Sequence, residues 1–125
     1  MERALVERIS AVGFCLGGSV AYVANAHLDL RAAVSFYGGG TDPNFAEKQR
    51  RPLLMFWGGR DQHIPSELYR SVADALSAAG KTHEQVVFSQ AGHAFFNDTR
   101  DRYDEGSARQ AWAMTVEFLR VFGAL

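Results

Sequence analysis

A cysteine, an aspartate and a histidine, far apart in this chain, are the side chains whose types could do chemistry together. Cys15 lies in the segment AVGFCLGG, Asp61 follows the segment WGGR, and His93 lies in the segment AGHAFF. A thiol can attack a carbonyl carbon, an imidazole can take up the thiol proton, and a carboxylate can hold the imidazole in one tautomer. These residue types predict nucleophilic catalysis, provided that the fold brings them together.

The segment around Cys15 has the pattern of a nucleophile elbow. An apolar strand is predicted to end at the cysteine, which Gly13 and Gly17 flank in a G-x-C-x-G pattern. In the serine form of this motif, glycines permit a sharp turn between a strand and a helix, so that the nucleophile stands exposed above the sheet. Unpaired amides and the positive dipole end of the following helix favour a thiolate over a thiol. Cys15 is therefore the candidate nucleophile.

Four apolar segments predict strands, and helical segments separate them. The predicted strands cover residues 8–14, 31–37, 52–57 and 84–89. Periodic apolar residues, among them Val20 and Val23, predict helices over residues 16–27, 65–79 and 103–122, with one further helical turn after Pro43. This alternation predicts an α/β fold with about four parallel strands and flanking helices. All 125 residues (1–125) are interpreted as a single domain.

The three candidate residues each follow directly after a predicted strand. Loops at the carboxyl ends of parallel strands lie along one edge of a sheet, so Cys15, Asp61 and His93 are predicted to meet there. Taken singly, a lone cysteine is often a buried apolar residue, an aspartate can cap a turn, and a histidine can lie in a surface loop. Their shared placement, in the order nucleophile, acid and histidine, favours catalysis. The other histidines lack this placement and are interpreted as solvated loop or strand residues: His27, His63 and His83.

Composition excludes several other classes of function. The chain has 13 Lys and Arg against 14 Asp and Glu, with a net charge of −1 and no basic stripe, so a nucleic-acid partner is not expected. It has neither a signal-like start nor an apolar run long enough to span a bilayer, which predicts a cytoplasmic location without membrane contact. A single cysteine excludes an intrachain disulfide and a cysteine-based zinc site. We expect neither a cofactor nor a metal.

The same motifs resemble the dienelactone hydrolase family, whose members are cysteine-dependent enzymes of the α/β-hydrolase fold. The segments that carry the resemblance are GFCLGG (13–18), FYG (36–38), GGRD (58–61) followed by Ile64 and Pro65, and GHAF (92–95). The resemblance implies that Cys15 is the nucleophile, Asp61 the triad acid and His93 the base. It also implies that the Leu16 amide forms one half of the oxyanion hole, and that the substrates are small-molecule esters or lactones.

The chain departs from the family in length and at one residue. It begins just before the strand that carries the nucleophile, so we expect a truncated α/β-hydrolase fold, equivalent to the C-terminal portion of a family member. The loop that supplies the second oxyanion amide is then missing, and one such donor accounts for roughly a hundredfold to a thousandfold in rate. Asn97 stands where the family places an arginine that holds the substrate carboxylate. Slow hydrolysis without strict dienelactone specificity is expected.

Truncation also turns the strand over residues 8–14 into a sheet edge with unpaired amides and carbonyls. We therefore expect a homodimer that covers this edge or the apolar face vacated by the missing helices. A second chain that supplies the missing half is an alternative partner. Two alternative functions stay open: a non-catalytic remnant that acts as a self-associating or partner-binding module, and a thiol sensor that reacts without turnover.

Overall fold

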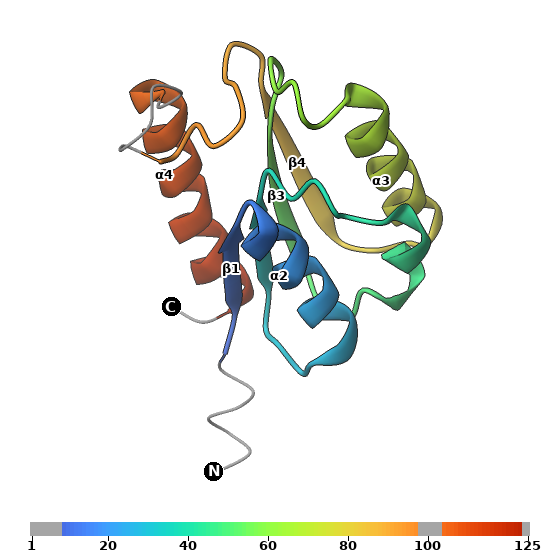
Figure 1. Cartoon of the computed structure of the whole chain (residues 1–125). Coiled ribbons are helices and arrows are strands. Elements are labelled where there is room, and N and C mark those ends of the chain that lie inside the picture. Colours follow the sequence, from blue (N-terminus) through green and yellow to red (C-terminus); the bar gives the residue numbers. More distant parts are fainter. Residues whose placement is uncertain (1–8, 98–103, 124–125) are drawn as a thin grey trace.

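The computed structural model describes residues 9–97 and 104–123. Strands alternate with helices along these residues, as the apolar pattern predicts (Figure 1). The elements in chain order are β1 (Ala11–Phe14), α2 (Leu16–His27), β2 (Ala33–Phe36), the short 3-10 helix η1 (Pro43–Lys48), β3 (Leu53–Gly58), α3 (Ser66–Ala78), β4 (His83–Phe88) and α4 (Glu105–Phe122).

The four strands form one parallel sheet in the order β1-β2-β3-β4. Helix α4 lies on one side of this sheet, and α2 and α3 lie on the other (Figure 1). The predicted α/β fold is confirmed. Because all the strands run in the same direction, the loops that follow β1, β2, β3 and β4 share one edge, at the top of Figure 1.

The core lies between these two layers of helices. Every residue of β2 and of β3 is buried, as expected for inner strands of a parallel sheet that is covered on both faces. On β1, by contrast, Val12 and Phe14 expose 39% and 37% of their surface. Among the described residues, β1 is hydrogen-bonded to β2 alone, so it forms one edge of the sheet.

Element boundaries differ from the prediction where particular residues interrupt the pattern. The second strand was predicted to reach Tyr37, but it ends at Phe36 because Tyr37 has a positive φ of 40°. Helix α4 was predicted from residue 103, which lies outside the described residues, and it begins at Glu105. The Asp104 side chain accepts a hydrogen bond from the Ser107 N–H at 3.0 Å and caps this helix. The first strand begins at Ala11, three residues later than predicted, and residue 8 lies outside the described residues.

The predicted helix α2 is present, but the apolar residues that repeat along it do not form its buried face. Val20 and Val23, which repeat at helical spacing, expose 57% and 41% of their surface. The buried face instead carries Ser19, Tyr22 and Asn25. The buried Asn25 amide donates to the side chain of Gln49 at 2.9 Å and to the Arg51 carbonyl at 3.0 Å, so its burial leaves this N–H group hydrogen-bonded.

Candidate active site

Cys15 lies at the junction of β1 and α2 in a strained backbone conformation. Its φ of 55° and ψ of −120° are uncommon for a residue that carries a side chain. The Cys15 N–H donates to the Phe36 carbonyl at 3.0 Å, and the Gly18 N–H donates to the Cys15 carbonyl at 2.9 Å. These hydrogen bonds hold the turn on both sides. A strained residue between strand and helix is typical of a nucleophile elbow.

Two glycines make this turn possible. They are Gly13, two residues before Cys15, and Gly18, three residues after it. A Cβ atom added to Gly13 would lie 1.9 Å from the Gly17 carbonyl oxygen, and one added to Gly18 would lie 2.6 Å from the Phe36 carbonyl oxygen. A Cβ atom on Gly17 would point into open space. The steric requirement therefore falls on Gly13 and Gly18, whereas Gly17 was expected to be needed in the turn.

The thiol, the imidazole and the carboxylate lie in a continuous row. Sγ of Cys15 is 3.6 Å from Nε2 of His93, and Nδ1 of His93 is 2.6 Å from Oδ2 of Asp61. Because an ionised carboxylate can only accept a hydrogen bond, Nδ1 carries the proton in this arrangement. Nε2 is then the acceptor that faces the thiol. The structure thus brings together the three residues that the sequence singled out.

Asp61 is fixed by hydrogen bonds to both of its oxygens. Its side chain is 1% exposed, and Oδ1 accepts from the backbone N–H groups of His63 at 2.8 Å and Ile64 at 3.1 Å. The carboxylate therefore caps its own turn through one oxygen and holds His93 through the other. Asp61 thus makes the contacts of both a turn cap and an imidazole partner.

Leu16 is the first residue of α2 and follows Cys15 directly. The N–H groups in the first turn of a helix have no intrahelical acceptor, so the Leu16 amide is available beside the thiol. Its side chain is 79% exposed and takes no part in the core. This arrangement can hydrogen-bond an oxygen that becomes negatively charged next to Cys15.

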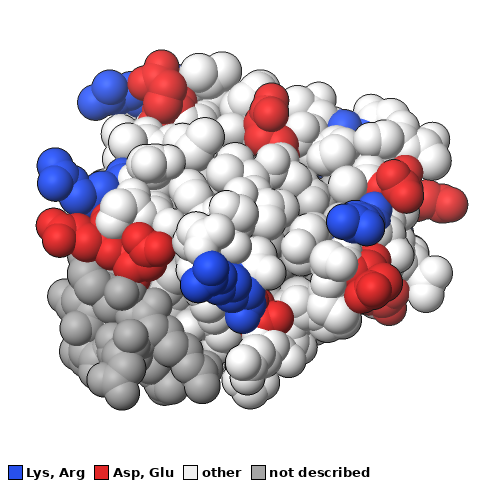
Figure 2. All heavy atoms as spheres, turned by 90° about the horizontal axis from the view of Figure 1, so that it is seen from above, with Lys and Arg blue, Asp and Glu red and all other residues white. Residues whose placement is uncertain are grey.

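Two pockets meet at the row of candidate residues. The first, of about 290 Å³, is lined mainly by apolar and aromatic groups: Phe14, Cys15, Tyr37, Ala94, Phe96 and Asn97. The second, of about 280 Å³, is polar and is lined by Arg60, Gln62, His63, Gly92 and His93. Figure 2 looks onto this end of the molecule, where charged side chains lie mainly around the rim and the centre is largely uncharged.

Backbone strain is concentrated at the apolar pocket. In the part of the chain that the structure describes, three residues other than glycine have a positive φ: Cys15 at 55°, Tyr37 at 40° and Ala94 at 58°. All three line the 290 Å³ pocket. Strained backbone of this kind clusters at functional sites. Tyr37 and Ala94 lie in the FYG and GHAF segments that carry the family resemblance, but the sequence analysis gave them no role of their own.

His63 is the residue near the site that the sequence interpretation missed. Its side chain is exposed, as expected of a loop histidine, but its ring lies 5.2 Å from the His93 ring, in an edge-to-face arrangement. The available signal was its position two residues after Asp61, where the backbone turns around the carboxylate. The other two histidines lie elsewhere: His27 ends α2, and His83 begins β4.

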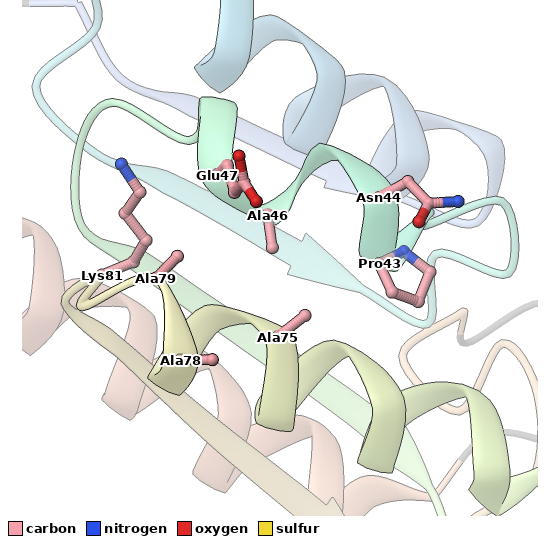
Figure 3. A pocket seen from close by; sticks show the side chains of 8 residues that line it. All are labelled: Pro43, Asn44, Ala46, Glu47, Ala75, Ala78, Ala79 and Lys81. Atoms are coloured by element: carbon pink, nitrogen blue, oxygen red, sulfur yellow. The ribbon is translucent and has the colours of Figure 1, made fainter.

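A larger pocket of about 580 Å³ lies away from these residues, between η1 and α3 (Figure 3). Figure 3 shows Ala46 of η1 and Ala75 of α3 pointing into the space between the two helices. The complete lining is Pro43, Asn44, Ala46, Glu47, Ala75, Ala78, Ala79 and Lys81. This lining includes none of the candidate catalytic residues.

Within residues 9–97 and 104–123, no group of three His, Cys, Asp or Glu side chains could hold a metal ion. None of the helices described there is long and apolar enough to cross a membrane.

The fold is similar to a part of solved dienelactone hydrolase and esterase structures. The chain belongs to the dienelactone hydrolase family, whose model matches residues 1–123. Over 127 residues it is 37% identical to a Salmonella typhimurium protein named "Putative carboxymethylenebutenolidase", covering 93% of this chain and 47% of that protein. The protein of the same name from Escherichia coli K12 is 34% identical over 129 residues, with 94% and 48% covered.

Solved structures with a similar fold include a dienelactone hydrolase and an esterase. The crystal structure of a "Putative Dienelactone Hydrolase" from Klebsiella pneumoniae superimposes with a TM-score of 0.81 at 33% identity, covering 85% of this chain and 49% of that one. A thermophilic esterase from Thermogutta terrifontis gives a TM-score of 0.75 at 25% identity, covering 95% of this chain and 57% of that one. The chain spans about half the length of the curated relatives it matches.

Proposed function

We propose that this chain is a thiol-dependent hydrolase of small-molecule esters or lactones that works through a triad of Cys15, His93 and Asp61. The observation that supports this most directly is the unbroken row of 3.6 Å from sulfur to imidazole and 2.6 Å from imidazole to carboxylate. Membership of the dienelactone hydrolase family supports the substrate class. The same two observations make the non-catalytic module the less favoured alternative.

In the first half of the proposed reaction, Nε2 of His93 takes the proton from Sγ of Cys15. The sulfur attacks the carbonyl carbon of the substrate and forms a C–S bond, while the carbonyl oxygen becomes an oxyanion that the Leu16 N–H stabilises. When the oxyanion collapses, the C–O bond to the leaving group breaks. His93 then gives its proton to the leaving oxygen, and a thioester remains on Cys15.

In the second half, a water molecule hydrolyses this thioester. His93 takes a proton from the water as its oxygen attacks the thioester carbonyl, the C–S bond breaks, and the proton on His93 returns to the sulfur. The carboxylic acid product leaves. Asp61 stabilises the positively charged imidazole in both halves without taking its proton.

The 290 Å³ pocket is the proposed place for the acyl group. Its lining combines the candidate nucleophile with the aromatic rings of Phe14, Tyr37 and Phe96. Apolar walls around a reactive group favour an apolar acyl chain. No Lys, Arg or His side chain is among the described residues that line this pocket, and Asn97 is uncharged.

Hydrolysis of 4-nitrophenyl butyrate by the wild type and by Cys15→Ala tests the proposal. We expect Cys15→Ala to fall to the rate of the buffer, because it removes the single thiol of the chain. Ser71→Ala, on the exposed surface of α3, is the matched control and should keep the wild-type rate. Mass spectrometry of quenched wild type should detect a butyryl group on Cys15. Equal rates for wild type and Cys15→Ala would contradict the proposal.

We also propose that a homodimer covers the β1 side of the molecule. Val12 and Phe14 of β1 are exposed, and so are Leu16, Val20 and Val23 of the neighbouring helix α2. An edge strand beside exposed apolar side chains is a ready surface for association. Light scattering tests this: the wild type should have the mass of a dimer and Val20→Glu that of a monomer, whereas a monomeric wild type at high concentration would refute it.

A cytoplasmic location stays a prediction, to be checked by fractionation of the source cells.

A further inference from the structure

We infer that the apolar pocket beside Cys15 selects esters whose acyl group carries an aromatic ring, with Phe14 and Phe96 as the residues that determine this specificity. The inference rests on the proposed function, because it names the acyl group that the proposed hydrolase prefers. Three of the six described residues that line this 290 Å³ pocket have aromatic rings, and a fourth is Cys15 itself. An acyl ring in the pocket therefore meets other rings next to the reacting sulfur.

The ring of Phe14 is held in place by a row of aromatic side chains that crosses the sheet. Phe14 of β1, Phe36 of β2 and Phe56 of β3 are register partners on neighbouring strands. The ring centroids lie 4.5 Å apart between the first two residues and 4.6 Å apart between the second and the third. Phe36 and Phe56 are fully buried, whereas Phe14 exposes 37% of its surface. The row thus ends in a supported ring that stays accessible from the pocket.

Phe96 forms a second aromatic wall and is also held by rings. Its ring centroid lies 5.2 Å from that of Phe14, 5.2 Å from that of Phe36 and 6.1 Å from that of Trp112 on α4. The side chain is half-buried, so part of it faces the pocket while the rest packs against these neighbours. Two ring walls with fixed orientations therefore stand beside the candidate nucleophile.

The positions of the two pockets assign the aromatic ring to the acyl part of the substrate. The apolar pocket is lined by Cys15, whereas the polar pocket is lined by His93. In the proposed reaction, the carbonyl carbon bonds to Sγ of Cys15, and Nε2 of His93 gives its proton to the leaving oxygen. The leaving group therefore lies toward the polar pocket, and the acyl group lies in the apolar pocket.

An aromatic ring gains more from these walls than a saturated ring of the same size. Both rings remove a similar apolar area from water, but the aromatic ring also makes stacked or edge-to-face contacts. Such contacts form at centroid separations of about 4.5–7 Å, the range in which Phe14, Phe36 and Phe96 already pair. The pocket should therefore distinguish a phenyl group from a cyclohexyl group.

Hydrolysis of 4-nitrophenyl phenylacetate and of 4-nitrophenyl cyclohexylacetate tests the inference, because the two esters differ only in the aromaticity of the acyl ring. We expect the wild type to prefer the phenylacetate about twofold to tenfold in kcat/KM, after each value is divided by the rate of hydrolysis by hydroxide. Phe14→Leu and Phe96→Leu keep an apolar side chain without a ring, so each should lower this ratio toward one. Phe45→Leu, on η1 and outside both pockets, is the matched control and should keep the ratio.

Protection of Cys15 from iodoacetamide tests the same pocket without ester turnover. Phenylacetamide should slow alkylation of the wild type at a lower concentration than cyclohexylacetamide does. The difference between the two amides should shrink in Phe14→Leu and in Phe96→Leu. Both assays are run at protein concentrations at which the chain is monomeric, so that no second copy covers Phe14.

The two assays separate the possible failures. If Cys15→Ala hydrolyses the esters at the wild-type rate, the proposed function fails, while stronger protection by phenylacetamide would still support the preference of the pocket for an aromatic ring. If Cys15→Ala is inactive and the wild type treats both esters equally, only the inference is overturned. Equal protection by the two amides would overturn it as well. A preference that survives in both phenylalanine variants would overturn the assignment to Phe14 and Phe96.

Discussion

The two halves of the candidate site stand on differently covered parts of the sheet. Asp61 and His93 follow β3 and β4, and β3 is buried along its whole length. Cys15 follows β1, which is an edge among the described residues and exposes Val12 and Phe14. Asp61 is therefore supported by a packed core, whereas His93 follows the partly exposed strand β4 at the opposite edge of the sheet and the nucleophile half depends on a local turn. The difference teaches that the elbow holds its shape mainly through backbone sterics and hydrogen bonds.

The acid–base half can be broken with one substitution. Asp61→Asn keeps an oxygen for the His63 and Ile64 amides, but it no longer stabilises the tautomer that leaves Nε2 facing the thiol. We expect kcat/KM for a 4-nitrophenyl ester to fall about a thousandfold to ten-thousandfold, with little loss of stability. Asp74→Asn, on the exposed surface of α3, is the control. A loss below tenfold would mean that Asp61 acts only as a turn cap.

The nucleophile half should fail through its backbone. Gly13→Ala sets a methyl group against the Gly17 carbonyl, so we expect lost esterase activity and a decrease of about 2–4 kcal/mol in the free energy of unfolding. Gly17→Ala meets no such obstacle, and alanine favours a helix over glycine by up to about 1 kcal/mol. Urea denaturation of both variants measures the contrast. Similar losses at the two glycines would contradict the assignment of the turn to Gly13.

The burial of β1 and of β2 can be compared by making the same valine-to-alanine substitution in each strand. Val12 of β1 and Val34 of β2 are register partners, but Val34 is fully buried and Val12 is 39% exposed. At concentrations where the chain is monomeric, we expect Val34→Ala to lower the free energy of unfolding by about 2 kcal/mol and Val12→Ala by less than about 1 kcal/mol; where the proposed homodimer forms, the loss at Val12 should rise. If the two losses are equal and depend on protein concentration, β1 is covered by a second chain, as the proposed homodimer requires.

The sequence was sufficient to predict four parallel strands and to place Cys15, Asp61 and His93 in loops at one edge of the sheet, because a parallel sheet brings its carboxyl ends to one edge. It was not sufficient where packing overrides local pattern. Val20 and Val23 form a helical stripe that lies exposed, while Asn25 is buried through hydrogen bonds to residues of another segment. The spacing of apolar residues within one helix does not indicate hydrogen-bond partners in another segment.

The contact of His63 with His93 was hidden for a related reason. It arises from two loops that are 30 residues apart in the sequence, and its geometry depends on the turn around Asp61. A histidine in a polar loop is usually solvated, so residue type and spacing gave no reason to prefer the contact. The sequence could locate the edge of the sheet where chemistry occurs, but it could not tell which loop side chains turn toward one another.

The smallest expected effect concerns the buried face of α2. This face is the best-packed part of the nucleophile half. Tyr22 is fully buried and its hydroxyl donates to the Asp42 carbonyl at 2.9 Å. Burial, followed by the negative charge of Asp42, raises the pKa of Tyr22 from 10.0 to about 12. The neutral phenol is thus favoured in the folded state, so its contribution to stability is complete below pH 10 and is lost as the pH rises toward 12.

Tyr22→Phe tests this pH dependence. At neutral pH we expect it to lower the free energy of unfolding by about 1 kcal/mol, the usual net value of one hydrogen bond. Above pH 10 the deficit should shrink, because phenylalanine has no proton to lose while the wild type is progressively destabilised. Urea denaturation of the two proteins at neutral and at alkaline pH measures the difference. A constant deficit across that range would mean that the Tyr22 hydroxyl does not titrate differently in the folded and unfolded chains.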